Sequence, residues 1–390
     1  MKVLSFGHIP SSKGGRQSSG LANVIYQLAY HGAEQDGVEM SLAATDVFVP
    51  YLKQDKLTIL GWTKKILVKH AFCNPFHTCK IIFNTIKTKY NFGALISVPG
   101  LLMKSIFFDY AIQKIRPEVI HLHGAHSVVY YYLIPKSSKL VVTLHGNVGT
   151  DQNLPNSDLH AKVEKRLCAS TRIDKLCTIS STIPEILKDA YGNITPEVKV
   201  ILNAYDDKVF KYIEPKLHSK LTLCTIASFS KLKGQERVID ALIQSGCNYR
   251  YVCIGHISDK DKMQLQNKYK DLDFEWLGVL APSQIRELLA KCDYMILPSS
   301  SEGFGLVYLE AIACGVPVII PRNLPLAKEG EILNASNSMM IEDCSVESIS
   351  KILPDLSSIQ WNRKTISDSV ISYSWDNIAK EYYSLYKSVL

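Results

Sequence analysis

The sequence predicts an α/β protein with two Rossmann-like, doubly wound domains, and two observations indicate this class. Short apolar runs of strand length alternate with segments of helical periodicity, once in the first half of the chain and again in the second. A polar segment at residues 212–220, interrupted by Pro215, separates the two series. Alternation of this kind is typical of parallel sheets that helices cover on both faces.

The first series begins with a strand at residues 2–6, after which a loop containing Gly14 and Gly15 leads to a helix at 21–31. We predict its further strands at 118–122, 140–144, 175–179 and 198–202. The second series has strands at 221–227, 250–254, 274–277, 293–297 and 316–320, with helices at 235–244, 259–269, 283–291 and 305–313. We expect an N-terminal domain of residues 1–215, joined by a C-terminal helix at 375–390, and a C-terminal domain of residues 216–374.

The composition is that of a globular, intracellular protein. With 390 residues, 46% of them hydrophobic and 21% charged, the chain is long enough for more than one core. Its ten cysteines are scattered without a C-x-x-C pair, which favours a reducing cytosol. The N-terminus has the pattern of a strand and not of a secretory signal, and no run of about 18 apolar residues occurs. We therefore expect a cytoplasmic protein.

Positive charge is concentrated in one segment. The net charge is +7 at pH 7, and residues 53–116 contain eleven basic residues with only Asp55 and Asp109 as acids. Aromatic and aliphatic residues lie among these cations, a composition that adheres to anionic membrane surfaces. A solvated basic face over ordinary core residues would give the same pattern. We expect peripheral attachment to the inner face of the cell membrane and no nucleic-acid partner.

Residues 302–317, EGFGLVYLEAIACGVP, contain the most specific pattern. A predicted strand leads into a glycine-rich turn at Gly303 and then into a helix N-terminus, whose free N–H groups bind anions. The amides of residues 304–306 (Phe304, Gly305 and Leu306) would face a phosphate, which leaves Glu302 and Glu310 to accept hydrogen bonds from sugar hydroxyls. The pattern fits a nucleotide sugar, although such turns occur throughout α/β proteins and Glu310 also fits a helix surface.

The longer stretch PSSSEGFGLVYLEAIACGVPVI resembles the signature of the retaining family-4 glycosyltransferases, which have the GT-B fold. In that family the first acid of the signature contacts the donor sugar and the second contacts the nucleotide ribose. The resemblance therefore assigns these roles to Glu302 and Glu310. It also implies two domains that face each other across a cleft, with the active site at the carboxyl ends of their strands.

Other segments follow the family order. Gly14 and Gly15 resemble the glycine loop that approaches the donor diphosphate, and His145 resembles the strand-end histidine near the reacting sugar and the acceptor. Lys233 matches the diphosphate-binding lysine of the family, and Gly255 follows the strand that ends near the nucleobase. Taken alone, the glycine pair is only a turn, and a lone histidine at a strand end is more often structural.

The chain departs from the family pattern at two positions. Ser228 stands where the family has an arginine on the diphosphate, and a hydroxyl cannot make the planar two-bond contact of a guanidinium. We expect weaker donor binding unless Lys231 compensates. Ala204 replaces the glycine of the Asn-Gly-x-Asp turn, which implies a different turn geometry.

No metal site is predicted. Asp271-Leu-Asp273 has the Asp-x-Asp pattern that binds a metal in another glycosyltransferase fold, but no cluster of carboxylates or histidines supports it. We interpret it as a solvated loop. Helix dipoles and Lys233 would neutralise the departing diphosphate without a metal or another cofactor.

The resemblance implies a retaining transferase that moves a sugar from a nucleoside diphosphate, for which we favour UDP, to a hydroxyl of a glycan or lipid-linked oligosaccharide. Glu302, His145 and Lys233 are its expected catalytic residues, and lipopolysaccharide or capsule synthesis is the expected setting. A phosphorylase-type member of the fold is an alternative, and so is a non-catalytic binder of nucleotide sugars or glycans, because of Ser228. A nicotinamide dehydrogenase is disfavoured because neither series has the required glycine spacing with a ribose-binding acid.

Overall fold

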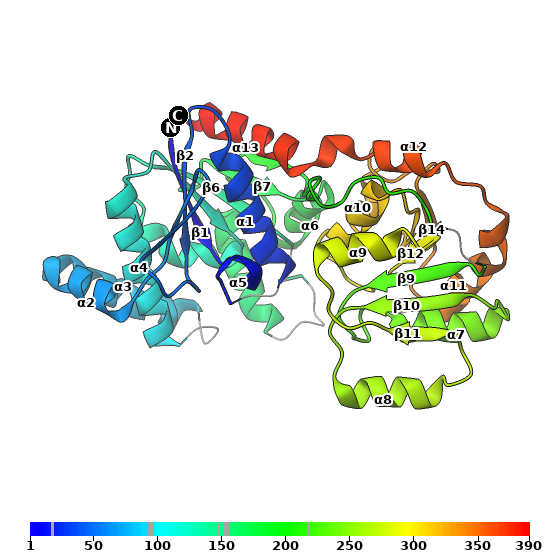
Figure 1. Ribbon diagram of the computed structural model, residues 1–390. Coiled ribbons are helices and arrows are strands. Elements are labelled where there is room, and N and C mark those ends of the chain that lie inside the picture. Colours follow the sequence, from blue (N-terminus) through cyan, green and yellow to red (C-terminus); the bar gives the residue numbers. More distant parts are fainter. Residues whose placement is uncertain (17–18, 93–96, 147–148, 151–155, 217–218) are drawn as a thin grey trace. The chain divides into compact units, whose positions relative to one another are not determined.

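The computed structural model contains two compact units, each with a mainly parallel sheet between layers of helices (Figure 1). It describes residues 1–16, 19–92, 97–146, 149–150, 156–216 and 219–390, with only the backbone for residues 89–92. Unit 1 consists of Met1–Asn203 and Trp375–Leu390, and unit 2 consists of Ala204–Ser374. Two parallel-sheet α/β units confirm the predicted fold class.

The sheet of unit 1 has the strand order β3-β4-β2-β1-β5-β6-β7-β8 within the described residues. All neighbours are parallel except β3 and β4, which form an antiparallel hairpin at the edge. Most side chains of β1, β5 and β6 are buried on both faces, as continuous apolar runs predict. The strands are β1 (Lys2–Gly7), β2 (Glu39–Ala44), β3 (Tyr51–Gln54), β4 (Leu57–Leu60), β5 (Val119–His123), β6 (Lys139–Leu144), β7 (Lys175–Thr178) and β8 (Val198–Val200).

The C-terminal helix belongs to unit 1, where it lies beside the first helix (Figure 1). His31 of α1 is hydrogen-bonded to Asp376 at the start of α13, and Tyr386 of α13 is bonded to His121 in β5. The helices of unit 1 are α1 (Gly20–Ala33), α2 (Lys64–Cys73), α3 (Pro75–Phe92), α4 (Val98–Ile115), α5 (Ser157–Cys168), α6 (Thr182–Tyr191) and α13 (Trp375–Val389).

Unit 2 has a wholly parallel sheet with the order β11-β10-β9-β12-β13-β14 in the described part of the chain. Its strands are β9 (Thr222–Ile226), β10 (Arg250–Ile254), β11 (Phe274–Trp276), β12 (Tyr294–Ile296), β13 (Val318–Pro321) and β14 (Ser338–Ile341). Its helices are α7 (Gln235–Ser245), α8 (Asp259–Lys268), α9 (Pro282–Leu289), α10 (Leu306–Ala313), α11 (Val346–Ile352) and α12 (Arg363–Asp368).

Both sheets contain a topological switch point, where the chain continues to opposite sides of one central strand. In unit 1, β1 is flanked by β2 and β5, and in unit 2, β9 is flanked by β10 and β12. The loops after β1 and β5, and those after β9 and β12, therefore diverge and leave space at the carboxyl edge. These two pairs of loops contain or adjoin most of the predicted site residues.

Several elements were absent from the sequence prediction. The sequence analysis did not predict the following elements: strands β2, β3, β4 and β14 and helices α2, α3, α4, α5, α6, α11 and α12. Strand β3 is a partly exposed edge strand of mixed polarity, and helices α2 and α3 are rich in exposed residues. None of these three elements therefore gives a strong apolar pattern. Among the described residues, no helix is long and apolar enough to cross a membrane. Residues 93–112 contain an apolar stretch that is interrupted by Pro99 and Lys104. This stretch mainly forms α4, and its residues 93–96 lie outside the described residues.

The polar segment at 212–220 lies wholly within unit 2, because the boundary between the units along the chain falls between Asn203 and Ala204. Just beyond this boundary, the N–H of Tyr205 donates to the carbonyl of Tyr373, at 3.1 Å. Tyr205 also forms an isolated bridge with Ser374. These contacts pair the first residues of unit 2 with its last ones. Residues 217–218 of the segment lie outside the described residues.

Candidate active site

An ion pair joins the two loops at the switch point of unit 2. Lys233 follows β9, Glu302 follows β12, and the Lys233 Nζ lies 2.5 Å from the Glu302 Oε1. The two side chains are 30% and 12% exposed, so the pair is shielded from bulk water but still accessible. A partly shielded cation and carboxylate at a switch point are suited to a polar, charged ligand.

Arg237 and Gln235, at the start of α7, hold these loops in place. The Arg237 guanidinium donates to the carbonyl of Lys231 at 2.7 Å and to that of Pro298 at 2.6 Å, which ties the β9 loop to the β12 loop. The Gln235 amide donates to the carbonyl of Ser228 at 3.1 Å. Sequence reasoning missed both residues, because a side chain that bonds to backbone carbonyls leaves no recognisable spacing.

The N-terminus of α10 is open to a ligand. Gly305 is the N-cap residue at φ +91° and provides no side-chain cap. Within the described residues, the N–H groups of Phe304, Gly305 and Leu306 have no hydrogen-bond partner. Together with the positive end of the helix dipole, they form a site for an anion. A Cβ at Gly305 would lie 2.7 Å from the Tyr308 ring, so this turn requires glycine.

Glu310 lies one turn into α10 and is half-buried. Burial and then repulsion from Asp206 raise the pKa of its carboxyl from 4.5 to about 7. No described side chain is hydrogen-bonded to this carboxyl group. A carboxylate desolvated in this way is strongly stabilised when a ligand supplies hydroxyl groups that donate hydrogen bonds to it.

The remaining predicted residues of unit 2 lie in the loops that follow β9, β10 and β12. Gly255 follows β10 at φ +137°, and a Cβ there would lie 2.2 Å from the carbonyl oxygen of Ala227, so only glycine allows the two loops to approach. Ser228 follows β9, and its carbonyl accepts the Gln235 bond. Gly303 is exposed in the turn, whereas the Phe304 side chain is buried beneath it. Lys231 is exposed.

Gly14 and Gly15 lie in the loop after β1 in unit 1. Gly14 has φ +95°, and a Cβ at Gly15 would lie 2.0 Å from the carbonyl oxygen of Ile9. The carboxylate of Asp46 accepts the N–H of Ile9 at 3.2 Å and that of Arg16 at 2.9 Å. The tight path of this loop therefore requires both glycines for its own folding, independently of any ligand.

His145 is part of a half-buried chain of polar side chains in or just after β1, β5 and β6. Its Nε2 lies 3.0 Å from the Nδ1 of His123, and the His123 Nε2 lies 3.0 Å from the Oγ of Ser5. Burial lowers the pKa of His145 to about 4, so its ring is neutral at pH 7. The His145 Nδ1 is buried without a partner in the described structure.

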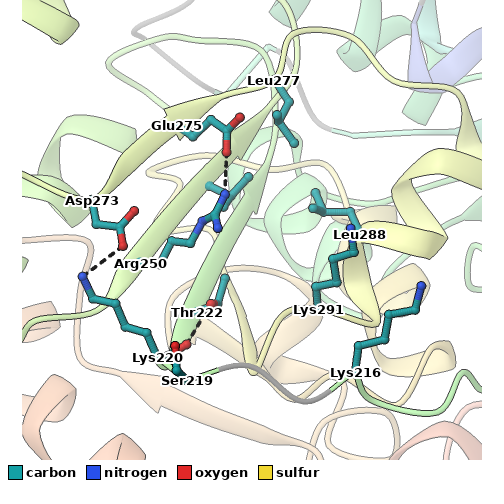
Figure 2. Close-up of a pocket in the computed structure, with 11 residues that line it drawn as sticks. Lys216, Ser219, Lys220, Thr222, Arg250, Asp273, Glu275, Leu277, Leu288 and Lys291 are labelled. Carbon is teal, nitrogen blue, oxygen red and sulfur yellow. Dashed lines mark hydrogen bonds and ion pairs between the residues drawn. The ribbon is translucent and has the colours of Figure 1, made fainter.

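One cavity of unit 2 is separate from these groups. It has a volume of about 630 Å³ and is lined by the segment before β9, by β10, by β11 and the residues beside it, and by the end of α9 and the turn after it (Figure 2). Two of its cations are neutralised, because Lys220 pairs with Asp273 at 3.0 Å and Arg250 with Glu275 at 2.6 Å (Figure 2). Asp273 of the Asp-x-Asp pattern is thus paired with a lysine. Among the described residues, no three metal-binding side chains form a cluster.

The predicted residues thus divide between the units. Gly14, Gly15 and His145 belong to unit 1, and the others lie around the switch point of unit 2. Open amides, a lysine and carboxyl groups at the carboxyl edge of a doubly wound sheet have the chemistry of a site for a phosphorylated sugar compound.

Comparison with known proteins identifies the class. The fold is that of GT-B glycosyltransferases: the chain aligns over its full length with sucrose-phosphate synthase from Thermosynechococcus elongatus, at a TM-score of 0.74, 15% identity and 99% coverage of that chain. It also aligns over its full length with Anabaena HepE in complex with UDP and glucose, at a TM-score of 0.69, 17% identity and 100% coverage of that chain.

Residues 18–209 match the family described as Glycosyltransferase Family 4, and residues 207–368 match Glycosyl transferases group 1. The chain is therefore a family-4 glycosyltransferase with the GT-B fold.

Curated relatives agree with this assignment. An uncharacterized glycosyltransferase of Methanocaldococcus jannaschii is 24% identical over 67% of this chain and 74% of its own length. The N-acetyl-alpha-D-glucosaminyl L-malate synthase of Bacillus anthracis is 24% identical over 60% of this chain and 66% of its own length. A GDP-mannose-dependent mannosyltransferase of Corynebacterium glutamicum, which acts on a monoacylated phosphatidylinositol monomannoside, is 27% identical over 56% of this chain and 61% of its own length.

Proposed function

We propose that the protein is a retaining glycosyltransferase that transfers a sugar from a UDP-sugar to a hydroxyl of a glycan or of a lipid-linked oligosaccharide. The observation that carries this proposal is the Lys233–Glu302 pair beside the open N-terminus of α10. A lysine and three free amides match a diphosphate, and the adjacent carboxylate matches the hydroxyls of the attached sugar.

Donor binding exchanges partners at this pair. The diphosphate contacts the amides of Phe304, Gly305 and Leu306 and draws the Lys233 ammonium toward itself. Glu302 is then released to accept hydrogen bonds from the sugar hydroxyls. Glu310, one turn further along α10, accepts the ribose hydroxyls. Because Gly255 has no side chain, its loop can lie close to Ala227, and this leaves space for the base.

Transfer then depends mainly on stabilising the leaving group. Negative charge accumulates on the diphosphate as the sugar departs, and Lys233 and the helix N-terminus are already oriented toward it. The departing oxygen takes the proton of the acceptor hydroxyl, which attacks from the same face, so configuration is retained. His145 is neutral and orients the sugar or the acceptor by a hydrogen bond from its unpartnered Nδ1. In this scheme the reaction needs no metal, and activity should survive treatment with EDTA.

The choice of UDP is supported by the structural relative that was solved with UDP and glucose. A relative that uses GDP-mannose makes GDP the direct competitor. A thermal-shift screen of UDP, GDP, ADP and their sugars tests the choice, because only a cognate ligand stabilises the native protein. Turnover assays should then show transfer to a glycan. Release of sugar to phosphate would identify a phosphorylase, and binding without turnover would identify a non-catalytic binder.

The proposal includes attachment to an anionic membrane, as in the assembly of bacterial lipopolysaccharide or capsule on the inner face of the cell membrane. Helices α2 and α3 contain no acidic residue. Phe72 and Phe76, at the turn between these helices, are 80% and 89% exposed. Exposed phenylalanines beside Lys64, Lys65 and Lys69 combine apolar insertion with attraction to anionic lipid.

Helices α2 and α3 form a helical hairpin, and contacts with α4 fix its orientation. Buried Asp109 of α4 lies 2.8 Å from the Nε2 of His70 in α2 and 2.9 Å from the Nε2 of His77 in α3. Replacing Phe72 and Phe76 with serine should release the protein from vesicles of phosphatidylglycerol, and so should replacing Lys64, Lys65 and Lys69 with glutamine. A control with Lys260, Lys262 and Lys270 of unit 2 changed to glutamine should sediment with vesicles like the wild type. Unchanged co-sedimentation of the hairpin variants would disprove this attachment surface.

A further inference from the structure

A second cavity lies at the switch point of unit 1. It has a volume of about 430 Å³, within the range of about 300–1,000 Å³ that is typical of small-molecule sites. Gly7 and His8 reach it from the end of β1, and His123 and Gly124 reach it from the end of β5. His145 lies behind His123, with the two rings joined by the 3.0 Å hydrogen bond. The cavity thus adjoins the predicted acceptor-side histidine.

Lys104 is the one lysine, arginine or carboxylate side chain among the described residues that line this cavity. It projects from α4 and is half-buried. In the described structure it has no carboxylate within 4.0 Å. The nearby acid, Asp46, uses its two oxygens to accept the backbone N–H groups of Ile9 and Arg16. A half-buried ammonium without a direct partner gains from binding an external anion.

The other polar groups of the cavity are mainly imidazoles. His8 lies 3.0 Å from the Thr45 hydroxyl, and the His126 Nε2 lies 2.8 Å from the His160 Nδ1. Burial, above all, lowers the pKa values of His8, His123 and His126, so these rings are neutral at pH 7. Neutral imidazoles donate and accept hydrogen bonds without adding charge, which suits hydroxyl groups.

Apolar side chains complete the lining. Phe6 and Tyr130 pack edge to face, with ring centroids 5.2 Å apart, and Leu21 and Ile25 come from α1. Such surfaces pack against the C–H groups of a sugar ring, while hydroxyls at its rim reach the imidazoles. The cavity therefore combines one cation, several neutral hydrogen-bonding groups and an apolar face.

We infer that this cavity binds an acidic acceptor sugar, with Lys104 of α4 holding its carboxylate or phosphate. The inference rests on the proposed transferase activity and specifies the substrate class for its acceptor side. Lys104 is a specificity-determining residue here and takes no part in bond making. Anion and hydroxyls are held by different groups, so the charge of the acceptor can be tested separately from its sugar ring.

The test compares three probes, glucose, glucuronate and glucose 6-phosphate, by titration of the full chain in saturating UDP. Glucuronate or glucose 6-phosphate should bind at least about tenfold more tightly than glucose, as expected for a charge-assisted contact. The tighter of the two acids identifies the group as carboxylate or phosphate. Lys104→Met should reduce the affinity for that probe to the level of glucose. Lys114→Met is the matched control, because Lys114 is on the same helix and does not line the cavity, and its bond within the described part of the chain is to the Tyr110 hydroxyl.

Two results would overturn the inference: glucose binding as tightly as both acids, or Lys104→Met retaining the preference. Absence of binding by all three probes would also count against it. UDP binding, measured on the same samples, separates these failures from failure of the proposed function. If UDP stabilises the wild type and Lys104→Met equally while the acids show no preference, the donor site stands and only the acceptor class is wrong. Equal melting temperatures of the two variants without ligand exclude misfolding as the cause.

Discussion

The two switch points share a topology but differ in the charge that they bury. In unit 2 the loops after β9 and β12 bring a lysine and a glutamate together, and the pKa of Glu310 is raised to about 7 by burial and by Asp206. In unit 1 the loops after β1 and β5 surround neutral imidazoles, with burial lowering the pKa of His145 to about 4. The parallel sheet thus determines where each site lies, and the side chains of its loops and of an adjacent helix, α4 in unit 1, determine which ligand charge it accepts.

The largest expected effect concerns the charged site. Glu302→Gln keeps the size of the side chain but removes the charge that pairs with Lys233. We expect the rate of sugar transfer to fall about 100- to 1,000-fold, since the lost interaction acts on the reacting sugar. Lys233→Met should have an effect of similar size. Initial rates with the cognate UDP-sugar measure both, and the melting temperature checks that each variant folds.

The control is Glu287→Gln, which alters an exposed glutamate of α9 and should leave the rate unchanged. Near-wild-type transfer by Glu302→Gln or by Lys233→Met would show that the donor does not bind at this switch point. The contrast drawn between the two units would then lose its functional meaning.

The second prediction tests the open helix end in unit 2. Gly305→Ala introduces a Cβ at φ +91° and 2.7 Å from the Tyr308 ring. We expect a loss of about 1–3 kcal/mol in stability, the usual cost of such backbone strain, together with weaker UDP binding. Gly330→Ala is the matched control, because a Cβ at Gly330 meets nothing within 4 Å. Urea unfolding midpoints of the two variants measure the difference, and equal midpoints would contradict the strain argument.

Much of the site in unit 2 could be predicted from sequence, because its groups are close together along the chain. Glu302, the glycine turn and Glu310 lie within nine residues, so a single strand–turn–helix pattern contains them. Lys233 was predicted only from the family resemblance, because its contact with Glu302 depends on β9 and β12 being neighbours in the sheet. Arg237 was missed because its partners are backbone carbonyls of two separate loops.

The site in unit 1 was largely invisible in the sequence. Of its histidines only His145 was singled out, yet His8, His123, His126 and His160 line the cavity that His145 adjoins. His8, His123 and His145 come together because β1, β5 and β6 are neighbours in the sheet, and no local pattern encodes that strand order. His126 joins them from the segment after β5, and His160 joins them from α5. Lys104 looked like one more cation of a basic segment, since its burial depends on how α4 packs.

The third prediction concerns pH and Glu310. The pKa of its carboxyl is raised by burial and by Asp206 from 4.5 to about 7, so the folded state favours the protonated form. The resulting stability is present below pH 4.5 and is lost as the pH rises toward 7. Glu310→Gln should therefore stabilise the protein at pH 8, on the order of 2 kcal/mol, with little effect near pH 4.5. Urea midpoints at both pH values test this, and a gain of the same size at each would refute it.

The smallest expected effect has the opposite pH dependence and lies in unit 1. Burial lowers the pKa of His145 from 6.5 to about 4, so the unfolded chain takes up a proton that the folded ring does not. The resulting stability is present above pH 6.5 and is lost as the pH falls toward 4. Between pH 7.5 and pH 5.5, His145→Gln should therefore lose less of its free energy of unfolding than the wild type does, by on the order of 1 kcal/mol. Hydrogen exchange of β6 at the two pH values reads out unit 1 specifically.

The matched control for this last change is His256→Gln, which alters an exposed histidine of unit 2 and should leave exchange in β6 unchanged at both pH values. Glutamine at position 145 can still bond to the His123 ring, so loss of the hydrogen bond does not obscure the result. If acid opens β6 equally in the wild type and in His145→Gln, the ring is not kept neutral by burial. The two switch points would then differ in their residues but not in their response to protons.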